Sequence, residues 1–127
     1  RRLPHDENLR ELNFGLWDGM HANDVFKNHP ELSKAYWSNP GDISPPNGES
    51  WNVAAKRINA AVDRLNALYP DDHIIAVAHF GVILTQVQRA MNISPKAVFA
   101  HKIDNLSATQ IVVNNARWNV ASINHSP

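Results

Sequence analysis

The chain has 127 residues, of which 43% are hydrophobic and 19% charged, a balance typical of one folded domain rather than a disordered chain. Basic and acidic residues both number 12, so no global positive field directs the protein to nucleic acid or to an anionic membrane. There is no cysteine, which excludes disulfides, thiolate metal sites and a thiol nucleophile, and fits a cytoplasmic location. We expect a single domain over residues 1–127, in which a local site recognises any charged ligand.

The first half of the chain predicts helices joined by turns. Residues 21–37 favour two short helices rather than one, because Pro30 interrupts the pattern. Residues 39–49 are rich in proline, glycine and asparagine and predict a loop. Ser50 then opens the best predicted helix. Its apolar residues recur at three- and four-residue steps: Val53, Ile58, Ala61, Val62, Leu65 and Leu68.

The second half predicts a sheet. Residues 74–78 form a continuous apolar run, which is typical of a strand covered on both faces and is far too short to cross a bilayer. Phe80–Gly81 turns the chain into a helix over residues 82–91. Residues 106–113 and 118–123, separated by a short turn, predict an antiparallel hairpin. This order of elements favours an α/β sheet with helices on both faces.

His79 stands where the apolar run ends and the helix begins. Ligands of α/β sheets bind beyond the carboxyl ends of strands, and a helix N-terminus attracts anions. A protonated imidazole there would add a charge, and Gly81 would let the backbone approach a ligand closely. A buried, hydrogen-bonded histidine explains the same local pattern equally well, so the pattern alone leaves both interpretations open.

Two other positions have competing interpretations. Glu11 can be an ordinary surface carboxylate, or a general acid whose pKa is raised by the leucine, phenylalanine and tryptophan near it in the sequence. Ser50 is better explained as a helix cap than as a nucleophile, because no Gly-x-Ser-x-Gly surrounds it. The seven histidines show no spacing typical of a metal site, so no metal is expected.

Four segments in chain order resemble the histidine phosphatase superfamily, with its phosphoglycerate-mutase-like fold. They are Leu9-Arg10-Glu11 with Phe14-Gly15-x-Trp17-Asp18-Gly19, Pro46-Asn47-Gly48-Glu49-Ser50 with Arg57, the run from Ile74 to Ile83, and Asn105-Leu106-Ser107-Ala108-Thr109 with the Trp118 hairpin. The resemblance implies a mixed, mostly parallel sheet flanked by helices. In that family a first histidine, in an Arg-His-Gly motif, takes the phosphoryl group from the substrate and water releases it.

The resemblance also implies roles for individual residues. His79 matches the second histidine, which holds the phosphoryl oxygens, and Glu11 matches the acid that protonates the leaving oxygen. The N–H of Phe80 and the close approach at Gly81 would bind phosphate. The family usually has glycine where this chain has Phe80, so we expect a bulkier wall there. The family chemistry requires no cofactor.

The chain contains no Arg-His-Gly, and only ten residues precede Glu11. The resemblance therefore implies a fold that is incomplete at the N-terminus, without the nucleophile and without two phosphate-binding arginines. Three explanations remain: a C-terminal part of a longer enzyme, a partner chain that supplies the rest, or a natural pseudo-enzyme. Because the missing strand would pair with residues 74–78, we expect an exposed edge and a homo-oligomer or strand-swapped dimer.

The function favoured by these features is hydrolysis of a phosphomonoester of a small metabolite by the intact parent, with the 127-residue chain inactive alone. The alternatives are a phosphoglycerate mutase and a non-catalytic module that binds a phosphorylated ligand. The expected partners are a small phosphorylated metabolite or inorganic phosphate, with no nucleic acid and no membrane. Trp37, Trp51 and Phe80 are candidates to line the substrate pocket, although core positions would explain them as well.

Overall fold

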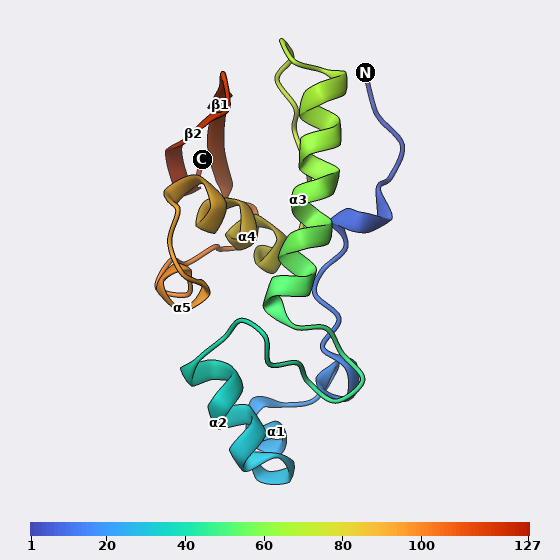
Figure 1. Ribbon diagram of the computed structural model, residues 1–127, viewed down its shortest axis with the longest axis vertical. Helices are drawn as coiled ribbons and strands as arrows, with labels where there is room; N and C mark the ends of the chain where they lie inside the picture. Colours follow the sequence, from blue (N-terminus) through green and yellow to red (C-terminus); the bar gives the residue numbers. More distant parts are fainter.

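The computed structural model describes all 127 residues and contains five α-helices, two short 3-10 helices and one hairpin. In chain order these are η1 (Glu7–Leu9), η2 (Gly15–Trp17), α1 (Ala22–Asn28), α2 (Pro30–Ser38), α3 (Trp51–Leu68), α4 (Phe80–Met91), α5 (Pro95–Val98), β1 (Ala108–Asn114) and β2 (Arg117–His125). Figure 1 shows α3 along the long axis, with α4 and the hairpin on one side and the N-terminal segment on the other. None of the helices is both long and apolar enough to cross a membrane.

The helix boundaries follow from local chemistry. Pro30 occupies the first turn of α2, so the predicted division into two short helices is confirmed. The Ser50 side chain accepts a hydrogen bond from the Val53 N–H at 3.2 Å, which confirms its role as the cap of α3. Helix α4 begins at Phe80, two residues before the predicted start, and ends at Met91, after which Asn92 caps it in a left-handed conformation.

The prediction of a mostly parallel sheet is wrong for this chain. Its one sheet is the antiparallel pair of β1 and β2, which includes the predicted hairpin. Residues 74–78 belong to no strand, and Ile75 and Val77 are 91% and 101% exposed. The expected burial on both faces is therefore absent. The physical reason is that β1 and β2 pair only with each other, so no strand is available beside residues 74–78.

The core lies where α3, α4 and α5 meet. Eight buried apolar residues form it: Leu12, Trp51, Ala54, Ile58, Val82, Leu84, Val87 and Val98. A smaller cluster of Trp17, Val25 and Tyr36 joins η2 to α1 and α2 at the far end of the molecule. Strand β2 covers α4, and the Arg89 guanidinium lies 4.0 Å from the centre of the Trp118 ring. Helix α4 is thus packed on two sides, which fixes the position of its N-terminus.

Candidate functional site

The N-terminus of α4 brings Glu11 and Gly81 together although 70 positions separate them. Glu11 Oε2 accepts a hydrogen bond from the Gly81 N–H at 3.3 Å, and Oε1 accepts one from the Leu12 N–H at 3.0 Å. A Cβ atom at position 81 would lie 2.9 Å from Leu12 Cδ1 and still closer to Glu11 Oε1. Only glycine therefore allows the carboxylate to lie this close to the helix end, where the macrodipole favours negative charge.

His79 caps the same helix with an extended backbone and an exposed side chain that makes no capping hydrogen bond. The alternative of a buried core histidine is therefore wrong. Phe80 follows as the first residue of α4, where the N–H group has no partner within the helix. The Phe80 ring is 52% exposed. The structure thus gathers His79, Phe80, Gly81 and Glu11 at one helix end, while their roles in binding and catalysis stay predictions.

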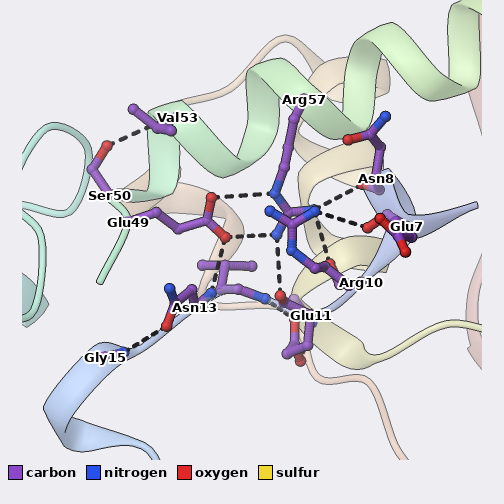
Figure 2. A network of polar contacts seen from close by, with 12 residues as sticks. Glu7, Asn8, Arg10, Glu11, Asn13, Gly15, Glu49, Ser50, Val53 and Arg57 are labelled. Atoms are coloured by element: carbon purple, nitrogen blue, oxygen red, sulfur yellow. Dashed lines mark hydrogen bonds and ion pairs between the residues drawn. The ribbon is translucent and has the colours of Figure 1, made fainter. Parts of the chain in front are cut away.

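Arg57, on α3, forms hydrogen bonds with the loop that carries Glu11 (Figure 2). Its Nη1 donates to the carbonyl oxygens of Asn8 at 2.7 Å and Arg10 at 2.9 Å. Its Nη2 donates to the Glu11 carbonyl oxygen at 3.1 Å and to Glu49 Oε1 at 2.6 Å, and Nε donates to Glu49 Oε2 at 3.2 Å. One guanidinium therefore fixes the backbone on both sides of the candidate acid without touching its carboxylate.

Glu49 completes this support. Its Oε1 accepts from the Asn13 N–H at 2.9 Å, and its own N–H donates to the Asn13 carbonyl oxygen at 2.8 Å. Burial alone would raise the pKa of the Glu49 carboxyl. Hydrogen bonds from Arg57 and Asn13, with the charges of Arg57 and Arg10, outweigh this effect and hold the pKa below its usual value. Glu49 is therefore a carboxylate at neutral pH and holds the Glu11 loop against the start of α3.

A cavity of about 500 Å³ opens beside the α4 N-terminus. It is lined by Leu12, Phe14, Tyr36, Trp37, Trp51, Phe80, Gly81, Leu84, Phe99, His101, Lys102 and Ile103. All three aromatic residues predicted as pocket candidates are among them, although Trp51 also belongs to the core. Burial, together with the charges of Glu11 and Glu49, raises the pKa of Tyr36 to about 12, so its hydroxyl is neutral.

Several of these residues escaped sequence reasoning. Glu49 was interpreted as part of a turn and of the segment matched together with Arg57, but the ion pair between these two residues was not predicted. His101 and Lys102 lie in an irregular segment with no periodicity, so nothing in the sequence indicated that they line a cavity. No three acidic or histidine side chains gather as a metal site would require.

The N-terminus of α4 and the exposed His79 beside it favour an anion at this end of the helix. The Glu11 carboxyl contacts the same helix end, and the apolar cavity adjoins it. Residues 2–126 match the family described as the histidine phosphatase superfamily (branch 1). The chain belongs to this superfamily.

Individual relatives show the similarity in sequence and in fold. The chain is 31% identical over 117 residues to phosphoglycerate mutase-like protein 4 of Arabidopsis thaliana, covering 91% of this chain and 50% of that protein. Its fold resembles Bacillus stearothermophilus YhfR with a TM-score of 0.87 at 22% identity, covering 96% of this chain and 61% of that one.

A mycobacterial glucosyl-3-phosphoglycerate phosphatase in complex with inorganic phosphate gives a TM-score of 0.80 at 26% identity, covering 95% of this chain and 64% of that one. The chain thus spans less than two thirds of the length of each of these relatives.

Proposed function

We propose that this chain carries the acid and phosphate-binding half of a phosphomonoester hydrolase that acts on a small phosphorylated metabolite. The meeting of Glu11 with the α4 N-terminus beside His79 supports this most directly. A protonated His79 and the Phe80 N–H would hold phosphoryl oxygens, and protonated Glu11 would give its proton to the leaving oxygen. The mycobacterial relative that binds inorganic phosphate supports the same ligand class.

Phosphate and Glu11 would share the helix end. The Gly81 N–H already donates to Glu11, so the free Phe80 N–H is the better donor for a phosphoryl oxygen. Because phosphate and an ionised Glu11 repel each other, protonation of Glu11 would favour binding of the substrate dianion. This is the protonation state that a general acid needs before the ester bond breaks.

In this proposal the nucleophile lies outside these 127 residues, which contain no Arg-His-Gly. We infer that a strand bearing this motif pairs with residues 74–78, either from the same polypeptide or from a second chain. The uncovered Ile75 and Val77 support this pairing, because an exposed apolar edge is a template for another strand.

The chain alone should then bind phosphate without turnover and associate with copies of itself. A clean monomer at micromolar concentration in size-exclusion chromatography with light scattering would argue against that association.

The catalytic cycle follows from these roles. An imidazole nitrogen of the added histidine attacks phosphorus, the ester P–O bond breaks, and Glu11 protonates the departing oxygen. Glu11, now a carboxylate, takes a proton from the water that attacks the phosphohistidine, and phosphate leaves as the imidazole is restored. The protein contributes mainly position and charge to these steps, which is what phosphoryl transfer requires.

The test uses the protein with its nucleophile segment present. His79→Ala should remove most turnover of para-nitrophenyl phosphate, because one ligand of the phosphoryl oxygens is lost. Glu11→Gln should slow alkyl phosphates, whose leaving groups need a proton, far more than para-nitrophenyl phosphate. A wild-type kcat in His79→Ala would remove His79 from the site. Equal losses for both substrate types in Glu11→Gln would make Glu11 structural.

The same site would also serve a phosphoglycerate mutase, which the Arabidopsis thaliana relative favours by name. In that reaction the phosphohistidine gives its phosphoryl group to a second phosphoglycerate hydroxyl rather than to water. Interconversion of 2- and 3-phosphoglycerate with little phosphate release would support the mutase. Phosphate binding without any transfer in the protein with its nucleophile segment present would support a non-catalytic binding module.

A further inference from the structure

The cavity beside the α4 N-terminus is placed to receive whatever is attached to a bound phosphoryl group. Phe80 and Gly81 belong both to its wall and to the helix end, and Leu12 follows Glu11 directly. Its volume of about 500 Å³ lies within the range of small-molecule pockets, roughly 300–1,000 Å³. A phosphomonoester held at His79 would therefore direct its alcohol portion into this cavity.

The walls of the cavity are aromatic rings from separate parts of the chain. Trp37 comes from α2, Trp51 from α3, and Phe99 follows α5. The Phe99 ring centre lies 5.8 Å from that of Trp37 and 4.9 Å from that of Trp51, where the rings meet edge to face. Trp37 remains 55% exposed even so. Trp51 is only 2% exposed and supports Phe99 from behind, so Trp37 and Phe99 are the rings against which a planar apolar ligand would pack.

Two of the polar groups that line the cavity already have partners. The Trp51 indole N–H donates to Gln88 Oε1 at 2.6 Å, and the Lys102 ammonium pairs with Asp104 at 2.8 Å. No arginine lines the cavity, so a carboxylate or second phosphate on the alcohol would find only His101 and the paired lysine. The Lys102 side chain is 79% exposed, so its ammonium stays hydrated and attracts an anion only weakly. A compact anionic alcohol would therefore lose hydration among the rings for a small electrostatic gain.

We propose that this cavity is the leaving-group subsite and that it selects phosphomonoesters of apolar, ring-bearing alcohols over esters of compact polar or anionic alcohols. This proposal depends on the proposed function in one respect: the phosphoryl group is bound at His79. Ring packing against Trp37 and Phe99 supplies the preference, and the polar hydroxyls of a small metabolite would gain nothing equivalent.

Calorimetric binding of benzyl phosphate and ethyl phosphate to the protein tests this selection. Both are dianionic esters of primary alcohols, so a difference in affinity reports on the ring. Benzyl phosphate should bind at least about tenfold more tightly, as expected from burial of an apolar ring. Trp37→Ala should reduce this preference about fivefold, the loss expected for one aromatic contact, and leave ethyl phosphate within about twofold of wild type.

Two further variants make the result specific. Phe99→Leu keeps an apolar side chain but removes the ring, and should also lower the preference for benzyl phosphate. It replaces Trp37→Ala as the test if circular dichroism shows that Trp37→Ala is poorly folded. Trp118→Ala removes a tryptophan outside the cavity and should leave the preference unchanged. Equal affinities for the two esters in wild type, no binding of either, or equal losses of both in the Trp37 and Phe99 variants would overturn the proposal.

Binding and turnover separate this inference from the proposed function. A protein that prefers benzyl phosphate but releases no phosphate, even with its nucleophile segment present, keeps the subsite and overturns the hydrolase. A protein that hydrolyses phosphate esters without a ring preference keeps the hydrolase and overturns the subsite.

Discussion

Replacement of Arg57 by methionine should destabilise the whole fold, because this side chain joins α3 to the loop that holds Glu11. Its guanidinium and the Glu49 carboxylate are each only 13% exposed, and Arg57 also donates to three backbone carbonyl oxygens. Removing one partner of a buried ion pair costs about 3–5 kcal/mol, and the residual exposure favours the lower end, about 3 kcal/mol. Such a loss is a large part of the free energy of unfolding of an ordinary domain.

Urea unfolding followed by far-UV circular dichroism measures this cost. Arg57→Lys should recover about half of the lost stability, because an ammonium has three donor hydrogens while Arg57 makes five hydrogen bonds. Arg64→Met is the matched control, because Arg64 is also an arginine on α3 that pairs with an acid, Asp6. The Arg64 side chain is 55% exposed, so its loss should lower the free energy of unfolding by about 1 kcal/mol or less. If Arg57→Met were no less stable than Arg64→Met, the network would not hold the loop.

Three other predictions concern neighbouring residues. Gly81→Ala should displace the Glu11 carboxylate, crowd Leu12 and slow hydrolysis of alkyl phosphates; unchanged kinetics would refute the close contact. Because folding lowers the pKa of Glu49, its contribution to stability is complete above about pH 4.5 and is lost as the pH falls through the pKa of the folded state. In Glu49→Gln the free energy of unfolding should therefore fall less steeply with acid than in wild type; parallel declines in both proteins would contradict this. Absorbance titration should show Tyr36 ionising near pH 12 rather than 10.0, and ionisation near pH 10 would show that the phenol is hydrated. The contribution of Tyr36 to stability is then complete below pH 10 and falls at higher pH, a decline that Tyr36→Phe should remove.

The helices of this chain were predictable because local chemistry determines their ends. Pro30 divides the first pair and Ser50 caps α3, and both effects act within a few residues. The start of α4 was placed two residues late because Phe80–Gly81 was interpreted as a turn rather than a helix start. Glycine at this position serves the contact with Glu11, which no local pattern records.

The sheet and the supporting contacts were less predictable because they depend on distant partners. The apolar run at residues 74–78 predicts a buried strand, but burial and pairing require a neighbour that the 127 residues do not supply. The convergence of Glu11 with the α4 N-terminus was expected only from the family resemblance. The binding of Arg57 to the loop carbonyls, and the position of His101 at the cavity, depend on how separated segments pack.

The junction at His79 joins two very different parts of the molecule. On its C-terminal side, α4 is packed against α3 and β2, so its amide hydrogens should exchange slowly with solvent. On its N-terminal side, Ile75 and Val77 are uncovered and residues 74–78 belong to no strand, so their amides should exchange almost freely. His79 is thus anchored from one side only. Any strand that pairs with residues 74–78 would anchor it from the other, so folding of that edge and orientation of the imidazole would be a single event.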